Sequence, residues 1–414
     1  MTQATAPCCY ANPDPRTFRG CCIGLSVATC LLFSGATTAA DSFWSTIQLH
    51  GFAAQSVIKT SDNRFFGDSP DTSFDSTEIG VNASIRLDPK VLVAGQVLAR
   101  RAGDMYDGTP SLDYALTDIA LIASPERILG IRLGRVKNPL GLYNETRDVP
   151  FTRPGIFLPQ VIYYDKVRNI VLSSDGAAVY GSLYNDLGEF SVTLVGGWPV
   201  LDDNVQWTYL GGDFPGTLRP NGSVWTGSLW YATVTEQLRF GLSGALASLR
   251  YAPHKNDILG PGQTDIVYGI ASLQYSARRL TLSAEYGLEP VRWRRYGPLL
   301  PRQKVTSEGY YLQGTYRIRS NLEFMACYEE GVADRDDRDG SEFEAVTGGL
   351  VPAHAMFSKI VTVGLRWDPT PNLMLRAQYQ WNQGTLVLSQ LENPDFPRQR
   401  EYWTLLALQV AFRF

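Results

Sequence analysis

The feature that most constrains the fold is the strict alternation of side chains in the last fourteen residues, Glu401–Phe414. One parity of this stretch is apolar apart from a single threonine, and consists of Tyr402, Thr404, Leu406, Leu408, Val410, Phe412 and Phe414. The other parity includes the polar residues Glu401, Gln409 and Arg413. Successive side chains of a β-strand point to opposite faces, so this stretch predicts a strand with one apolar and one polar face.

The same alternation recurs in residues 78–87, 280–289, 322–329 and 373–382. Short turns and long loops rich in Gly, Pro, Asp and Asn strictly alternate along the chain. The turns lie at 88–90, 124–127, 185–188, 235–237, 277–278, 319–320 and 368–371. The loops lie at 60–73, 103–111, 137–170, 198–223, 251–263, 294–303, 333–356 and 385–400. Seven turns and eight loops connect sixteen strands, which predicts an all-β fold, an antiparallel transmembrane β-barrel of about sixteen strands.

Composition excludes other classes of protein. With 44% hydrophobic and 19% charged residues, the chain beyond its N-terminal region has no run of 18 or more apolar residues, so a helical membrane protein is excluded. The formal net charge of −4 gives no basic excess, and we therefore expect no nucleic-acid partner.

The N-terminal region predicts export. Arg16 and Arg19 precede the uncharged run 20–40, whose apolar core and small final residues predict a secretory signal peptide over residues 1–40 and a barrel over 41–414. The alternatives are an uncleaved anchor helix, for which the apolar core is short, and lipid attachment at Cys30, where the apolar run continues past the cysteine. After cleavage only Cys327 would remain, so no internal disulfide could form.

The polar parity of the strands predicts a hydrated interior. Charged side chains are costly to bury without partners, and barrels of sixteen to eighteen strands leave an aqueous channel. Together these arguments predict a pore. Aromatic residues near strand ends are expected at the membrane interface, namely Tyr402, Trp403, Trp381, Trp367, Trp230 and Tyr231.

The long loop 137–170 is the candidate constriction, because its apolar and proline residues between 156 and 162 favour packing against another surface. The passage Gly134–Leu142 (GRVKNPLGL) that leads into it resembles the phosphate-selective porin superfamily of Gram-negative outer membranes. That resemblance implies that this third long loop folds into the lumen. It also implies a multi-pass barrel in the outer membrane, contact with lipid and lipopolysaccharide, a homotrimer, and recognition of Phe414 by the barrel assembly machinery.

Charged residues on the inner parity and in this loop are the predicted pore-lining and constriction residues. They are Glu78, Arg86, Arg100, Arg132, Arg147, Asp148, Arg153, Lys166, Arg168, Glu285, Arg317, Glu323, Arg366 and Arg376. Lysines are few and acids are mixed with the arginines, which favours a porin for passive diffusion of small hydrophilic solutes or ions. Two alternatives stay open: a channel selective for anionic solutes such as phosphate or organic acids, and a closed adhesive or structural barrel.

An enzyme is disfavoured. Residues 41–414 contain only His50, His254 and His354, and no nucleophile elbow, zinc-protease motif or phosphate-binding glycine loop occurs. We therefore expect no catalytic residues, no cofactor and no metal.

Overall fold

The computed structural model describes residues 46–298, 300 and 303–414, and the strands among them form one antiparallel sheet. The predicted signal peptide lies outside the described residues. The strands are β1 (Ile47–Thr60), β2 (Ser73–Asp88), β3 (Val91–Ala102), β4 (Tyr106–Ala123), β5 (Arg127–Lys137), β6 (Ser173–Asn185), β7 (Gly188–Pro199), β8 (Thr217–Pro220), β9 (Val224–Ala232), β10 (Leu238–Ala252), β11 (Gln263–Ser276), β12 (Leu280–Arg294), β13 (Gln303–Arg319), β14 (Leu322–Val332), β15 (Phe357–Thr370), β16 (Leu373–Gly384) and β17 (Tyr402–Arg413). The short helices are η1 (Pro150–Thr152), η2 (Asp165–Val167), α2 (Arg168–Leu172), α3 (Asp203–Leu210), α4 (Ser341–Val346), η3 (Ala353–Met356) and η4 (Phe396–Arg398).

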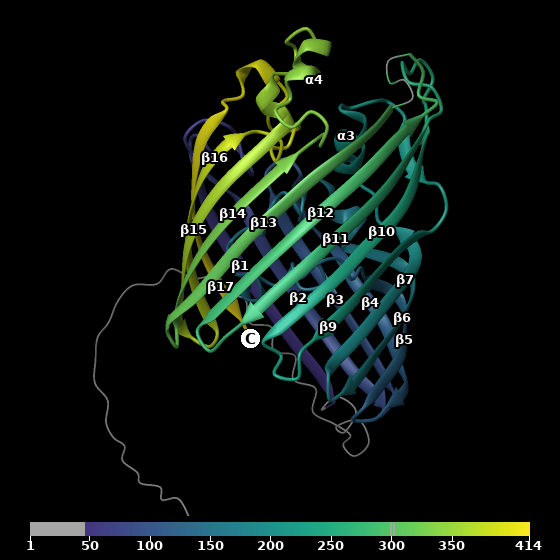
Figure 1. Cartoon of the computed structure of the whole chain (residues 1–414), viewed down its shortest axis with the longest axis vertical. Helices are drawn as coiled ribbons and strands as arrows, with labels where there is room; N and C mark the ends of the chain where they lie inside the picture. The colour runs from purple at the N-terminus through teal and green to yellow at the C-terminus, as the bar shows by residue number, and fades with distance from the viewer. Residues whose placement is uncertain (1–45, 299, 301–302) are drawn as a thin grey trace, which may run out of the picture. The chain divides into compact units, whose positions relative to one another are not determined.

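The sheet closes on itself, because β1 pairs with β2 on one side and with β17 on the other (Figure 1). Strands β8 and β9 both pair with β10 and share one position in the ring. The seventeen strands therefore build a closed sixteen-stranded barrel, which confirms the predicted fold class. Among the described residues, none of the helices has the length and apolar character needed to cross a membrane.

Strand parity places apolar side chains on the outer surface. In β17, Leu406, Leu408 and Val410 are exposed, whereas Leu405 and Ala407 on the other parity are fully buried. Exposed leucine, valine, phenylalanine and tryptophan side chains occur in the same way on strands around the ring. Such a continuous apolar surface is unfavourable in water but matches the hydrocarbon core of a bilayer. The architecture is therefore that of an outer-membrane β-barrel.

The predicted turns and loops match the connections with two exceptions. The predicted loop 198–223 contains the short strand β8, which pairs with β10. The predicted loop 103–111 is wrong, because β4 begins at Tyr106 and only residues 103–105 connect it to β3. The pairing of β3 with β4 contains two register irregularities, between Gln96 and Val97 and between Ala99 and Arg101. Such bulges accommodate turn-forming residues, here Gly108 and Pro110, within a strand.

The predicted aromatic girdle is only partly correct. Tyr402, Trp367 and Trp381 are exposed on the outer face. Trp403, by contrast, is 3% exposed and packs with Phe65 and other buried residues. Trp230 lies on the inner parity, where the Arg239 guanidinium sits 5.1 Å from its ring centroid. Because neighbouring residues of a strand face opposite sides, Tyr402 and Trp403 could not both face lipid.

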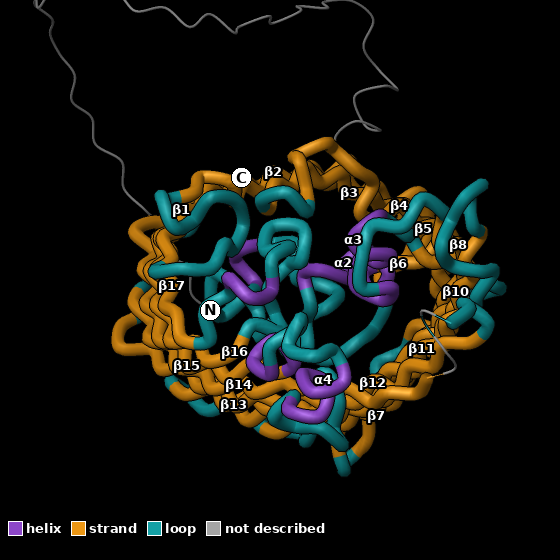
Figure 2. Tube along the Cα trace, turned by 90° about the horizontal axis from the view of Figure 1, so that it is seen from above, coloured by secondary structure: helices purple, strands orange, loops and turns teal. Residues whose placement is uncertain are grey.

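Seen from above, loops and short helices lie within the ring of strands (Figure 2). The connection between β5 and β6, residues 138–172, contains η1, η2 and α2. Its apolar residues share one buried cluster with strands β11, β13, β14 and β15 and a second with β1, β3 and β17. A third cluster joins it to α3, β10, β11 and β12. We call residues 138–172 the inner segment.

Candidate functional site

The inner segment is seated on three glycines of the wall. Gly287, Gly309 and Gly331 are paired in register across β12, β13 and β14, and we call them the glycine row. A Cβ atom added at Gly309 would lie 2.5 Å from the carbonyl oxygen of Val161, and one at Gly331 would lie 2.8 Å from the Val161 Cγ1. The missing side chains therefore let the backbone of the inner segment approach the strands closely.

The carboxylates of Glu285 and Glu329, which are buried on the wall, accept hydrogen bonds from the backbone of the inner segment. The backbone N–H of Leu142 donates to Glu285 over 2.8 Å, and the hydroxyls of Tyr163 and Tyr311 also donate to this carboxylate. The backbone N–H of Val161 donates to Glu329 over 3.1 Å. Glu285, predicted to line the pore, is instead 2% exposed and anchors the segment.

Arginines anchor the inner segment to another part of the wall, formed by β2 and β16. Arg153 of the segment pairs with Glu78 of β2, with 3.0 Å between Nη1 and Oε1. Arg376 of β16 donates to three carbonyl oxygens of the segment, those of Pro150, Gly155 and, over 2.8 Å, Arg153. Arg376 is 5% exposed, so it too is an anchor rather than an exposed lining residue.

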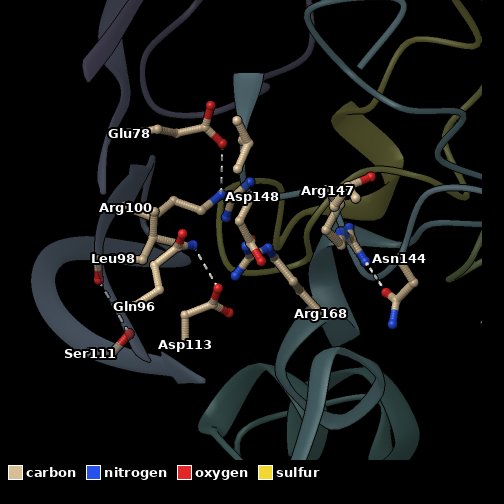
Figure 3. A network of polar contacts seen from close by, with 12 residues as sticks. Glu78, Gln96, Leu98, Arg100, Ser111, Asp113, Asn144, Arg147, Asp148 and Arg168 are labelled. Carbon is tan, nitrogen blue, oxygen red and sulfur yellow. Dashed lines mark hydrogen bonds and ion pairs between the residues drawn. The ribbon is translucent and has the colours of Figure 1, made fainter. Parts of the chain in front are cut away.

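A network of ion pairs joins these anchors. Asp165 lies 2.9 Å from Arg100 of β3 and 3.4 Å from Arg147. Asp148 contacts both Arg168 and Lys137. Figure 3 shows Glu78 and Arg100 on the wall facing Asp148 and Arg168 of the segment. We call Arg100, Arg147, Arg153 and Arg168 the arginine cluster; all four are buried.

The guanidinium groups of the cluster destabilise one another's charge. Burial, together with the positive charges of Arg100 and Arg147, lowers the pKa of Arg168 to about 9. Burial and the charge of Arg100 also lower the pKa of Arg147, although Asp165 opposes this shift. The three acids in contact with the cluster, Glu78, Asp148 and Asp165, therefore compensate its charge only in part.

A different environment surrounds the inward-facing arginines near the short turns. We call these the turn-end arginines: Arg86, Arg132, Arg239, Arg317, Arg366 and Arg413. Arg132 pairs with Asp118 over 3.0 Å and Arg366 with Asp368 over 3.1 Å. For the other four, the described ranges contain no carboxylate within 4.0 Å. Glu323 stands opposite both Arg317 and Arg366 in the strand register.

The predicted site residues thus fall into two groups. Arg86, Arg132, Arg317, Glu323 and Arg366 are exposed or half-buried, and their role as lining residues stays a prediction. Two of them also reach the inner segment: Arg132 lies 3.9 Å from Glu145, and Arg366 donates to the carbonyl oxygen of Phe151 over 3.2 Å. The remaining nine belong to the anchored inner segment or to the wall behind it: Glu78, Arg100, Arg147, Asp148, Arg153, Lys166, Arg168, Glu285 and Arg376. Lys166 donates to the carbonyl oxygen of Leu386 over 2.6 Å.

The expectation that inner charges require water is wrong for the second group, because ion pairs and backbone hydrogen bonds hold these side chains in buried positions, although some of their polar atoms have no partner. Sequence reasoning also missed Asp113, Lys137 and the glycine row. A usable signal for the row was present: Gly287, Gly309 and Gly331 recur on the inward parity of three consecutive strands.

Solved structures share this architecture. The anion-selective porin from Comamonas acidovorans is similar over 89% of this chain and 99% of its own, with 12% identity and a TM-score of 0.55. OprB of Pseudomonas putida is similar over 91% of this chain and 96% of its own, with 11% identity and a TM-score of 0.54. The trimer form of OmpT, an outer membrane protein of Vibrio cholerae, is similar over 89% and 99%, with 11% identity and a TM-score of 0.53.

Neither a protein-family model nor a curated protein matches the sequence. At these identities the likeness defines the fold, and the chain has the fold of outer-membrane porins. The narrower resemblance to the phosphate-selective superfamily stays a prediction.

Proposed function

We propose that the protein is a porin, a water-filled channel for passive diffusion of small hydrophilic solutes, with a preference for anions. The observation that carries this proposal is the set of turn-end arginines, four of which have no carboxylate within 4.0 Å in the described part of the chain. Sixteen strands enclose a lumen wide enough for water. Guanidinium groups facing such a lumen attract anions and repel cations.

The inner segment is the constriction in this proposal. Its contacts with Glu78 on β2, Glu285 on β12, Glu329 on β14 and Arg376 on β16 support this role, because a segment held by all four strands would reduce the free cross-section of the lumen. Solutes would pass beside the segment and then along the turn-end arginines. The anion preference follows from electrostatics at both places, since the arginine cluster is also incompletely neutralised.

The reversal potential in a salt gradient tests the selectivity. We expect the wild type to prefer anions, and Arg239→Gln together with Arg317→Gln to shift the reversal potential toward zero or toward cation preference. Arg135→Gln is the matched control, because Arg135 pairs with Asp175 on the outer parity, away from the lumen. An unchanged reversal potential in the double variant would contradict the proposed role of the turn-end arginines.

A closed barrel is the second candidate function, because buried apolar clusters join the inner segment and α3 to the wall around much of the ring. A barrel filled in this way would act through its long loops as an adhesive or structural protein. Conductance separates the two candidates: discrete open steps require a pore, whereas a folded barrel without steps supports the closed form.

We further propose that the protein is exported, inserted into the outer membrane and assembled into a homotrimer. Residues 1–40 would direct secretion and be removed, leaving the barrel 41–414 to insert beside lipid and lipopolysaccharide. Phe414, the aromatic residue that follows β17, would be recognised by the barrel assembly machinery. A homotrimer is the proposed assembly, in keeping with the trimer form described for OmpT of Vibrio cholerae.

A further inference from the structure

We propose that the cavity between the arginine cluster and the wall is a binding site for a single monoatomic anion the size of chloride. This site would be a fixed part of the fold that ties the inner segment to β3, distinct from anions that pass through the lumen. The proposal does not rest on the proposed function, because a buried anion could serve an open channel and a closed barrel equally.

The cavity has the size of one small particle. Its volume is about 20 Å³. Its lining contains two acidic residues, five arginines and, among others, Phe66, Phe157 and Gln409; the charged residues are Glu78, Asp165, Arg100, Arg101, Arg147, Arg153 and Arg168. A cavity of roughly 10–15 Å³ by this measure holds one water-sized particle. Phosphate and carboxylate-bearing solutes are too large, so a monoatomic ion is the anion class that fits.

Two cationic donors in the residues that line this cavity have no protein partner. The Nη1 of Arg100 and the Nε of Arg153 are buried and make no hydrogen bond. The two residues are 8% and 9% exposed. An unsatisfied buried donor costs about 1–3 kcal/mol, and more when it is charged, so both groups require an acceptor.

The surrounding charge favours an anion over a water molecule. The arginine cluster and Lys137 carry five positive charges, whereas their ion-pair partners Glu78, Asp113, Asp148 and Asp165 carry four negative charges. The nearby buried Arg376 hydrogen-bonds only to carbonyl oxygens in the described chain, which adds to the excess. A water molecule would accept the hydrogen bonds but leave this charge uncompensated in a dry site, whereas an anion does both.

Gln409 lines the cavity and would provide a further donor if its amide were turned. Its Nε2 donates to the hydroxyl of Ser56 over 3.0 Å, while its Oε1 has no partner. If the amide is turned by 180°, the Ser56 hydroxyl can donate to the amide oxygen and the NH₂ group can point toward the cavity. The site would then present donors from Arg100, Arg153 and Gln409, which belong to β3, the inner segment and β17.

Bromide replaces chloride and can be located by its anomalous scattering. Crystals of the barrel grown in sodium bromide are expected to show an anomalous peak between Arg100 and Arg153, near full occupancy. Arg153→Lys keeps the charge opposite Glu78 but lacks the Nε donor, and we expect it to lose the peak. Arg317→Gln, at the exposed turn end, is the matched control and should retain it. Density for a water molecule without an anomalous signal in the wild type would overturn the proposal.

Hydrogen exchange provides the test in solution. Backbone amides of the inner segment are expected to exchange several-fold more slowly in sodium chloride than in sodium gluconate of equal ionic strength, because chloride binds the seated segment. Arg153→Lys should remove this difference and Arg317→Gln should keep it. Equal exchange in both salts for the wild type would contradict the site. Neither readout depends on conductance, so failure here is distinguishable from failure of the channel proposal.

Discussion

Two glutamates on the same face of strand β14 have different surroundings. Glu329 of β14 is 2% exposed and accepts a hydrogen bond from the inner segment, whereas Glu323, six residues away, is half-buried near the turn end opposite Arg317 and Arg366. Strand parity assigns both to the inner face. Their surroundings depend on whether the inner segment covers that stretch of wall, so the segment divides one inner surface into a dry region and an exposed region.

The largest effect is expected from breaking the anchoring in the dry region. Glu78→Gln removes the carboxylate that contacts Arg153 and Arg100, and losing one partner of a buried ion pair costs about 3–5 kcal/mol. We expect greatly accelerated hydrogen exchange in the inner segment, while the strands stay protected. The double variant Glu78→Gln with Arg153→Gln should recover part of the protection, because it removes the unpaired charge. Exchange as slow as in the wild type for Glu78→Gln would mean that this pair does not hold the segment.

A smaller effect is expected from the glycine row. Gly309→Val would bring its Cβ to 2.5 Å from the Val161 carbonyl oxygen, and such overpacking typically costs about 1–3 kcal/mol. The segment should leave its seat, which would raise the single-channel conductance. Gly269→Val on β11 is the matched control, because a Cβ there meets no atom within 4 Å. Equal conductance in both variants would show that the glycine row does not set the pore width.

The smallest effect on stability is expected at the turn end, where Arg239 and Arg317 are exposed. Replacing both by glutamine should leave the thermal unfolding midpoint within experimental error, because exposed side chains without buried partners contribute little. The same variant should change ion selectivity, as proposed above. A substantial loss of stability would place these arginines in contacts of the kind found in the dry region and would remove the contrast between the two regions.

Local pattern predicted most of the fold but only part of the site. Alternation identified the faces of β2, β12, β14, β16 and β17, and turn chemistry gave the number of strands, because both signals are encoded within about ten residues. Parity also puts Arg317 and Arg366 on the inner face with Glu323, and their role as pore-lining residues stays a prediction. The predicted interfacial position of Trp403 is wrong, because it rests on residue type and strand position, whereas strand parity points this side chain inward.

The dry region could not be predicted, since it depends on contacts between residues far apart in the sequence. Glu78 meets Arg153 and Glu329 meets Val161 only after the barrel has closed around the inner segment. Charge on the inner parity therefore does not by itself indicate water, because paired charges can also be buried. The ion pairs of Lys137 could not be predicted for the same reason, because its partners Asp113 and Asp148 lie on β4 and in the inner segment.

The most direct test of the account is single-channel conductance of refolded residues 41–414 in a planar bilayer with a salt gradient. We expect stable open steps whose reversal potential shows a preference for anions, with larger steps for Gly309→Val than for Gly269→Val. A correctly folded barrel that stays silent in the wild type and in both variants would contradict the channel and leave the closed barrel as the function to pursue.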